Sequence, residues 1–274
     1  MAPGVSAGRG LGEAKRPMKT ERRKRRANVI PSDPAWEAAK STCRTIDHDD
    51  AVQESVFLQK QFYELWGHRV ATSPVDLNQV LWTLTQKKIP FVLTGAHGIG
   101  GWTGRPRSTK DVDILVKGGR NQARAVNALK ALYPELEVRT FAGVSAFFPP
   151  GERESVLDVT YPHRADLEET LANPVWVENK AQGLRYRIPS LEAALANKYG
   201  AMLTPSRNSI KRRQDILDFE WMVTHSLDEG QQPIDLKRLT ALGEKVWPGG
   251  GGEEILRLVE QVRSGEAIQL DSLG

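Results

Sequence analysis

Cysteine is almost absent, because Cys43 is the only one in the 274-residue sequence. A single cysteine excludes a disulfide within the chain and a zinc site built on several thiolates. The five histidines are scattered at positions 48, 68, 97, 163 and 225. No two of them have the spacing of metal ligands on one helix, so the sequence lacks a cysteine- or histidine-based metal motif.

Long apolar runs are also absent. No stretch approaches the roughly 20 consecutive apolar residues of a membrane helix, and the N-terminus lacks the apolar segment of a secretory signal. We therefore expect a cytoplasmic protein without a membrane partner. With 39% apolar residues, the chain is long enough to bury a core and is typical of one domain with appendages or of two small domains.

Acidic residues are scarce at the start of the chain. Residues 1–26 contain nine Lys or Arg and two acids, which gives this segment a net charge of +7 and leaves about −3 for residues 27–274. Residues 1–31 have almost no large apolar side chains, so they are predicted to be a disordered basic tail. The basic run at 22–26 could bind nucleic acid or remain solvated.

Apolar periodicity predicts the elements in the rest of the chain. In order they are helices at 51–70 and 73–88, a strand at 91–94, a loop or short helix at 95–110, a strand at 112–116, a helix at 120–133, strands within 136–148 and at 155–160, and helices at 190–203, 207–225, 234–246 and 253–263. Ser73 before Pro74 resembles the N-cap and first turn of the second helix. A Pro-Gly run at 248–252 separates the last two helices. This order predicts an α/β or α+β core.

Three aspartates in predicted strands suggest a metal site. Asp111 and Asp113 are two residues apart, so their side chains point to the same side of a strand. Asp158 interrupts the apolar run 156–160 in the same way. Mg²⁺ prefers oxygen ligands, usually one or two carboxylates together with water and substrate phosphates. We therefore expect the three carboxylates to converge on a metal–nucleotide complex, with Asp158 as the base or as a ligand on the side of the base.

A glycine turn and a basic loop lie beside these acids. Gly95 follows the strand at 91–94 and could let a phosphate approach backbone N–H groups at a helix start. Arg105, Arg107 and Lys110 could add positive charge nearby. Glycine after a strand is equally typical of an ordinary turn, so the order of the motifs is more informative than the glycine alone.

This order resembles the nucleotidyltransferase superfamily, in which a Gly-Gly or Gly-Ser turn precedes Asp-x-Asp on a strand and a later acid. Gly95, Asp111, Asp113 and Asp158 match that pattern. The Arg-x-Thr-Lys-Asp-x-Asp form at 107–113 resembles the abortive-infection AbiEii-type toxins. The similarity covers roughly residues 76–225 and continues through Ile188-Pro189-Ser190-Leu191-Glu192, Lys198, Arg207, Lys211, Asp215 and Asp218. Ala96 stands where the superfamily usually has Gly or Ser, so a serine hydroxyl contact to phosphate is missing.

The resemblance implies an α+β nucleotidyltransferase fold, with a mixed sheet, flanking helices and a C-terminal helical region. It divides the chain into the tail at 1–31, an N-terminal helical segment at 32–73, a core at 74–188 and a helical region at 189–274. It also implies Mg²⁺ or Mn²⁺ as cofactor and an NTP as substrate, bound with the help of Gly95, Ala96, Arg107, Lys110 and Lys198. The acceptor could be an RNA end such as that of tRNA, a protein or a small molecule, and an antitoxin is a candidate partner.

Lys198 can also be interpreted without the family. It lies on the apolar stripe of Leu191, Leu195 and Met202, so it should point inward. A nucleotide phosphate or a carboxylate would then neutralise it, although a packed stem with the amine in water is an equally reasonable alternative.

Four further residues have less specific patterns. Asp215 and Asp218 share a helix face with Lys211, four residues before Asp215, and we expect a structural ion pair between Lys211 and Asp215. His97 could touch a base or phosphate, but a hydrogen-bonded structural histidine is the more common outcome. Trp102 lies in the glycine-rich segment and could stack on a nucleobase.

Three functional hypotheses remain. The first is metal-dependent transfer of NMP from an NTP to an unidentified acceptor. The second is a catalytically weak or inactive relative that binds nucleotide or nucleic acid in a regulatory role; retention of all three aspartates argues against it. The third is a protein that binds nucleic acid chiefly through its tail, which predicts a steep salt dependence that disappears when residues 1–30 are deleted.

Overall fold

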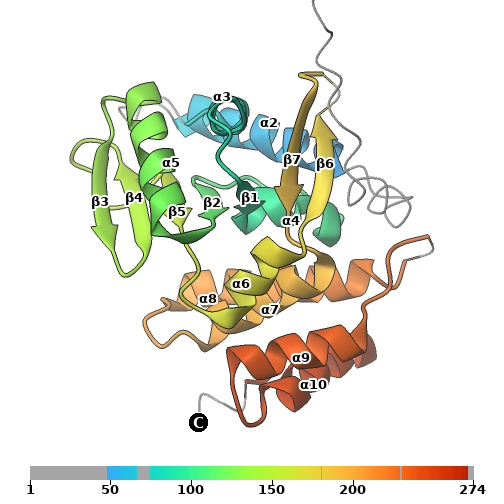
Figure 1. The fold of residues 1–274 in the computed structure, drawn as a ribbon. Helices are drawn as coiled ribbons and strands as arrows, with labels where there is room; N and C mark the ends of the chain where they lie inside the picture. Colours follow the sequence, from blue (N-terminus) through green and yellow to red (C-terminus); the bar gives the residue numbers. More distant parts are fainter. Residues whose placement is uncertain (1–47, 67–74, 180, 229, 271–274) are drawn as a thin grey trace, which may run out of the picture. The chain divides into compact units, whose positions relative to one another are not determined.

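The computed structural model describes residues 48–66, 75–179, 181–228 and 230–270. They all belong to one compact unit that spans residues 33–274. The predicted tail at 1–31 and the proposed cap at Ser73 and Pro74 lie outside the described residues. The described elements are α2 (His48–Trp66), α3 (Leu77–Gln86), β1 (Phe91–Thr94), α4 (Gly95–Thr103), β2 (Val112–Val116), α5 (Gly118–Leu132), β3 (Glu137–Phe141), β4 (Val144–Phe148), β5 (Leu157–Thr160), α6 (Ala165–Ala172), β6 (Val175–Asn179), β7 (Leu184–Ile188), α7 (Leu191–Leu203), α8 (Ser209–His225), α9 (Leu236–Val246) and α10 (Gly251–Ser264) (Figure 1).

Five strands form a mixed sheet in the order β1-β2-β5-β4-β3. The central pair, β2 and β5, is parallel, whereas every other neighbouring pair is antiparallel. β1 and β2 are short strands made mostly of apolar residues, and both strands are largely buried. The register places Asp113 directly beside Asp158. The predicted fold class, an α+β protein with a mixed sheet and flanking helices, is confirmed.

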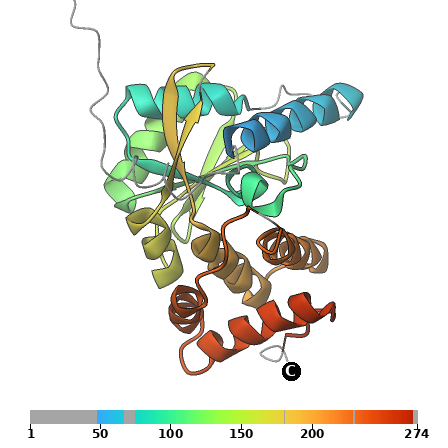
Figure 2. The same cartoon turned by 90° about the vertical axis from the view of Figure 1, so that its right-hand side faces the viewer.

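The last four helices gather on one side of the strands (Figures 1 and 2). α7 packs against α8 and α9, and α9 packs against α10. One apolar core includes residues of the sheet and of these helices, among them Ile114, Phe147, Leu157, Leu195, Tyr199, Phe219, Leu239 and Leu258. The helices are therefore held against the sheet by the same hydrophobic burial that stabilises the strands. None of the described helices is both long enough and apolar enough to cross a bilayer.

Two of the predicted helix boundaries are wrong. Helix α3 begins at Leu77 rather than at residue 73, because the side chain of Asp76 accepts hydrogen bonds from the backbone N–H groups of Asn78 and Gln79 and caps the helix. Helix α10 begins inside the glycine run, at Gly251. A Cβ at Gly251 would lie 2.3 Å from the carbonyl oxygen of Gly243 in α9. Glycine here allows two helices to touch and does not merely separate them.

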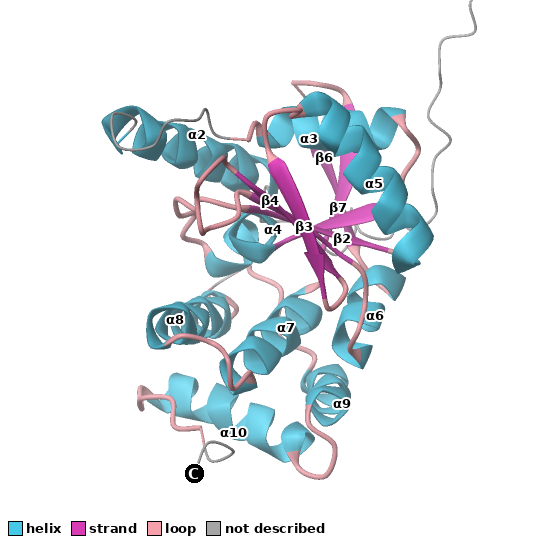
Figure 3. Ribbon diagram, turned by 90° about the vertical axis from the view of Figure 1, so that its left-hand side faces the viewer, coloured by secondary structure: helices cyan, strands magenta, loops and turns pink. Residues whose placement is uncertain are grey.

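The segment between residues 161 and 188 contains structure that is missing from the predicted order of elements. Helix α6 and the β6–β7 hairpin lie there, and the hairpin forms a separate two-stranded sheet (Figure 3). Only alternate residues of β7 are buried, and Arg185 and Arg187 occupy the intervening positions. This alternation of apolar residues with arginine is the period-two pattern of a half-buried strand, so β7 had a readable signal in the sequence that the predicted element order missed.

Candidate active site

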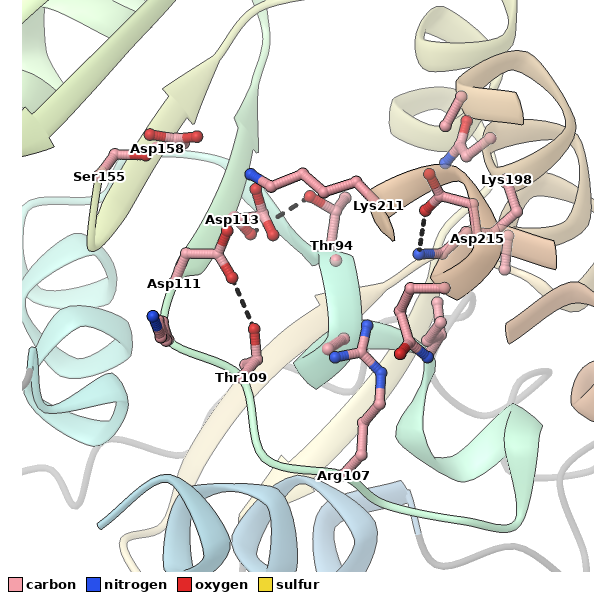
Figure 4. Close-up of a pocket in the computed structure, with 18 of the residues that line it drawn as sticks. Thr94, Arg107, Thr109, Asp111, Asp113, Ser155, Asp158, Lys198, Lys211 and Asp215 are labelled. Atoms are coloured by element: carbon pink, nitrogen blue, oxygen red, sulfur yellow. Dashed lines mark hydrogen bonds and ion pairs between the residues drawn. The ribbon is translucent and has the colours of Figure 1, made fainter. Parts of the chain in front are cut away.

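A cavity of about 590 Å³ lies between the end of the sheet and the last helices. One wall contains the start of α4, the loop that precedes β2, and the neighbouring strand β5. The opposite wall contains α7 and α8, which contribute Lys198, Lys211 and Asp215 (Figure 4). The pocket therefore has an acidic side made by strands and a side rich in cations made by helices.

The strands bring the three predicted aspartates to this pocket. Asp113 lies within β2, and Asp158 is its register partner on the parallel strand β5. Asp111 immediately precedes β2, two residues before Asp113, and all three residues line the cavity. The hydroxyl of Thr109 donates a hydrogen bond of 2.5 Å to Oδ1 of Asp111 and orients that carboxylate.

The acidic cluster has an electrostatic cost. Burial raises the pKa of Asp113 well above its usual range, and the nearby charges of Asp111 and Asp158 raise it further, although Lys198 and Lys211 oppose this. The pKa of Asp158 is also raised, first by burial and then by Asp111, while Ser155 and Lys211 act in the opposite direction. Like charges brought together in a poorly solvated place favour protonation unless a cation joins them.

The residues fit a hard divalent cation that the substrate helps to coordinate. Oδ1 of Asp158 is buried and has no hydrogen-bond partner, and carboxylate oxygen is the preferred donor for Mg²⁺ and Mn²⁺. In the described part of the chain, no three His, Cys, Asp or Glu side chains form a ready-made metal cage, so the three aspartates would need substrate phosphates and water to complete the coordination of a cation. Mg²⁺ commonly needs no such cage, since water and substrate phosphates complete its coordination.

Gly95 is required where β1 meets α4. Its φ is +61°, and a Cβ would lie 1.9 Å from Oδ2 of Asp113. Glycine therefore satisfies a left-handed backbone and leaves room for a site carboxylate. The N-cap residue Thr94 makes no side-chain cap hydrogen bond to α4. Thr94, Gly95 and Ala96 line the pocket, so a helix start without a side-chain cap is presented to it.

The basic loop has a different role at each predicted position. The guanidinium of Arg107 donates two hydrogen bonds to Asp218 on α8, with N–O distances of 3.1 and 3.0 Å. Nζ of Lys110 lies 3.0 Å from Glu154 in an exposed ion pair at the pocket. Arg105 lies over the ring of Trp221, outside the residues that line the cavity.

Lys198 points inward and forms ion pairs with two carboxylates. Its Nζ lies 2.9 Å from Asp215 and 2.6 Å from Asp218, and its side chain is 13% exposed. Arg207 also pairs with Asp215, at 2.7 Å. Burial alone would raise the pKa of Asp218, but Lys198 and Arg107 outweigh it and hold that pKa below its usual value.

The predicted pair of Lys211 with Asp215 is wrong. Lys211 has no carboxylate within 4 Å in the described residues, because Asp215 is already held by Lys198 and Arg207. The side chain of Lys211 instead reaches toward Asp113 (Figure 4). Lys211, Arg207 and Thr109 also line the pocket, although they were not predicted as site residues. For Lys211, the available signal was its position near the start of a helix, among other basic residues.

His97 and Trp102 are structural. Trp102 is 2% exposed, and its indole N–H donates to the carbonyl oxygen of Pro189 at 2.9 Å. The prediction that it could stack on a base is therefore wrong. Nδ1 of His97 lies 2.6 Å from the Ser55 hydroxyl, and burial lowers its pKa to about 4. His97 is thus a neutral, hydrogen-bonded core residue, as the more common alternative predicted.

Comparison with known proteins finds likeness only among solved structures. No protein-family model and no curated protein matches the chain. An antigenic nucleotidyltransferase-like protein from Paracoccidioides brasiliensis is 18% identical over 69% of this chain and 95% of its own, with a TM-score of 0.40. ANT(2")-Ia in complex with adenylyl-2"-tobramycin is 15% identical over 69% and 95%, with a TM-score of 0.39. JHP933 from Helicobacter pylori is 14% identical over 70% and 94%, with a TM-score of 0.36. Because these identities and TM-scores are low, the functional assignment depends on the residues of the pocket itself.

Proposed function

We propose that this protein is a metal-dependent nucleotidyltransferase that transfers NMP from an NTP to an acceptor hydroxyl and releases pyrophosphate. One observation carries the proposal: the parallel pairing of β2 with β5 places Asp113 beside Asp158, and Asp111 lines the same cavity. A stable fold has no need for a cluster in which the charges of Asp111 and Asp158 raise the pKa of the buried Asp113. Such a cluster is typical of a site that functions with a cation.

Mg²⁺ or Mn²⁺ is the proposed cofactor, held by Asp111, Asp113 and Asp158. When bound, the cation neutralises the triphosphate and lowers the pKa of the acceptor hydroxyl. The unpartnered Oδ1 of Asp158 and the oxygen-only donor set support this choice.

The chain's own groups divide the remaining tasks of the reaction. The acceptor oxygen forms a bond to the α-phosphorus. The bond between that phosphorus and the oxygen that bridges the α- and β-phosphates breaks, and pyrophosphate leaves with the electron pair of the broken bond. Asp158 takes the hydroxyl proton, a role supported by its position beside Asp113 and by its unpartnered Oδ1. We assign the binding of phosphate oxygens to the N–H groups at the start of α4, beside Gly95 and Ala96, because this helix start has no side-chain cap and lines the pocket. Thr109 holds Asp111 in position.

The finer assignment, an AbiEii-type toxin of a toxin–antitoxin or phage-defence system, is part of the proposal. It is supported by the motif at 107–113 and by Lys198, Asp215 and Asp218, which the structure brings into one ion-pair network. The acceptor would be an RNA end such as that of tRNA, a protein hydroxyl or a small molecule. Growth arrest on expression of the parent protein, but not of an Asp113→Asn variant, would support a toxin role and give a screen for an antitoxin.

The second candidate function is a relative that binds nucleotide or nucleic acid without transfer. The specific observation in its favour is Ala96, which lines the pocket where a serine hydroxyl would otherwise reach a phosphate. The three aspartates favour catalysis, because nucleotide binding alone does not require an activated acceptor.

Labelling a cell lysate separates the two functions. The protein is incubated with each NTP labelled at the α-phosphate, a divalent cation and the lysate, and the labelled acceptor is then identified. We expect one class of macromolecule or small molecule to be labelled by the parent and not by Asp158→Asn. Specific Mg-NTP binding without any labelled product would support the non-catalytic alternative.

A further inference from the structure

Six cationic side chains line the pocket. Lys110 pairs with Glu154 and Arg164 pairs with Asp166. The remaining four are Arg107, Lys198, Arg207 and Lys211. Three of them are already engaged. Arg107 is bidentate on Asp218, Lys198 bridges Asp215 and Asp218, and Arg207 holds Asp215. Asp215 and Asp218 are 1% and 0% exposed. These three cations therefore neutralise two buried carboxylates that would otherwise be very costly to bury.

Lys198 cannot readily leave this network to bind a ligand. Its ammonium has three donors, and two of them face carboxylates at 2.9 and 2.6 Å. Turning the ammonium toward a phosphate would reduce the compensation of Asp215 and Asp218. Its predicted role in nucleotide binding is thus better explained as positioning, because it joins α7 to α8 next to the cavity.

Lys211 differs from these three cations in its exposure and in its lack of an ion pair among the described residues. It is exposed, and no carboxylate lies within 4 Å of its amine in the described parts of the chain. Asn208 caps the start of α8 by accepting a hydrogen bond of 2.8 Å from the backbone N–H of Lys211, which fixes the position of the residue. Figure 4 shows the side chain extended across the pocket toward Asp113, away from Asp215.

We propose that Lys211 binds the β- and γ-phosphates of the NTP and stabilises the charge that develops on the leaving pyrophosphate, whereas Lys198 is a positioning residue. This inference rests on the proposed nucleotidyl transfer. The amine faces the acidic cluster across a gap of more than 4 Å, and a phosphate oxygen in that gap could contact the amine while remaining close to the cation site. An available ammonium where negative charge develops lowers the barrier for bond cleavage.

Substitution of each lysine by methionine tests this division of roles. Lys237→Met is the matched control, because Lys237 is an exposed lysine in the first turn of α9. Calorimetry measures the affinity for Mg-NTP, inorganic pyrophosphate and NMP, thermal unfolding measures the melting midpoint, and a labelled assay measures kcat. NMP is informative because it lacks the two phosphates assigned to Lys211.

For Lys211→Met we expect about tenfold or greater weakening of Mg-NTP and pyrophosphate binding, the loss typical of one charge-assisted hydrogen bond. NMP affinity and the melting midpoint should match the Lys237→Met control, kcat should fall, and Lys211→Arg should restore part of the loss. Lys198→Met should instead lower the melting midpoint. Parent-like pyrophosphate binding by Lys211→Met, or an equal loss of NMP affinity, would overturn the assignment.

The outcomes also distinguish this inference from the proposed function. A parent protein that transfers nucleotide, together with an equally active Lys211→Met variant, refutes the role of Lys211 alone. A parent protein that neither binds Mg-NTP nor labels an acceptor refutes both.

Discussion

Two constraints require glycine at position 95: its left-handed backbone and its close approach to the Asp113 carboxylate. A Cβ there would meet Oδ2 of Asp113, and the φ of +61° is unfavourable for any side chain. Gly95→Ala should therefore destabilise the protein and abolish Mg-NTP binding. Gly118→Ala is the control, because Gly118 has a φ of +73° with nothing within 4 Å of a Cβ.

The control separates strain from the clash with Asp113. Gly118→Ala should cost only about 1–2 kcal/mol of unfolding free energy, the strain of the left-handed conformation, and should leave binding intact. The measurements are denaturant unfolding and calorimetry. Equal effects of the two substitutions on Mg-NTP binding would contradict the contact between Gly95 and Asp113.

His97 predicts a pH dependence of stability. Burial lowers its folded pKa to about 4, below the ordinary value of 6.5, so the unfolded chain binds a proton in a range where the folded protein does not. The contribution of neutral His97 to the free energy of unfolding is fully present above pH 6.5 and is lost as the pH falls toward 4. Between pH 7.5 and 5 this loss should be about 2 kcal/mol.

Denaturant unfolding at pH 7.5 and 5 measures this loss, and His97→Asn should reduce it by that amount, whatever its effect on baseline stability. The other buried groups are present in both proteins, so the difference between the two pH dependences reports on His97 and its interactions with Asp111 and Arg107. An unchanged pH slope in the variant would show that His97 is not the source.

The pair of aspartates before and within β2 could be predicted from the sequence, because their spacing along the chain determines which way they point. The separation of two residues between Asp111 and Asp113 predicts a shared face, and both line the pocket. The partners of Lys198 could be predicted only as a class, since Asp215 and Asp218 are on a different helix. The availability of Lys211 depends on Asp215 being held by Lys198 and Arg207, which no local pattern encodes.

At the scale of elements, the capping of α3 gives a simple test of a helix boundary. Asp76 accepts hydrogen bonds of 2.9 and 3.2 Å from two backbone N–H groups in the first turn. Asp76→Ala should lower the free energy of unfolding by about 1 kcal/mol, while Asp76→Asn should retain most of the cap. Thermal or denaturant unfolding of the two variants measures this, and equal stability of Asp76→Ala and the parent would contradict the observed boundary.

Most elements with long apolar runs or strong apolar periodicity could be predicted, whereas two short strands and one short helix were missed. The buried strand β1 is an apolar run, β2 is an apolar run interrupted only by Asp113, α7 is apolar and buried on most sides, and α9 and α10 have regular apolar stripes. Helix α6 has only eight residues and β6 lacks a regular alternation, whereas the alternation in β7 was a signal that could have been used. Their stability comes from packing against α7 and β1, and tertiary packing of this kind does not appear in a local window.

At the scale of the whole molecule, charge is unevenly distributed along the chain. The first 26 residues carry +7, whereas residues 27–274 carry about −3. Removal of residues 1–30 should leave the melting midpoint and Mg-NTP affinity nearly unchanged, because the pocket residues all lie between positions 62 and 215. A large loss of either would show that the segment belongs to the fold, and a salt-dependent loss of nucleic-acid binding would assign the tail that role.

Nucleotidyl transfer is tested most directly by comparing two positions of the label in the NTP. Parent protein, Mg²⁺, the acceptor fraction and NTP labelled at either the α- or the γ-phosphate are incubated in parallel, with Asp113→Asn as the control. The arrangement of Asp111, Asp113 and Asp158 predicts that the acceptor retains the α-label, that the γ-label is released as pyrophosphate, and that Asp113→Asn produces neither. Transfer of the γ-label to the acceptor, or equal labelling by parent and Asp113→Asn, would contradict it.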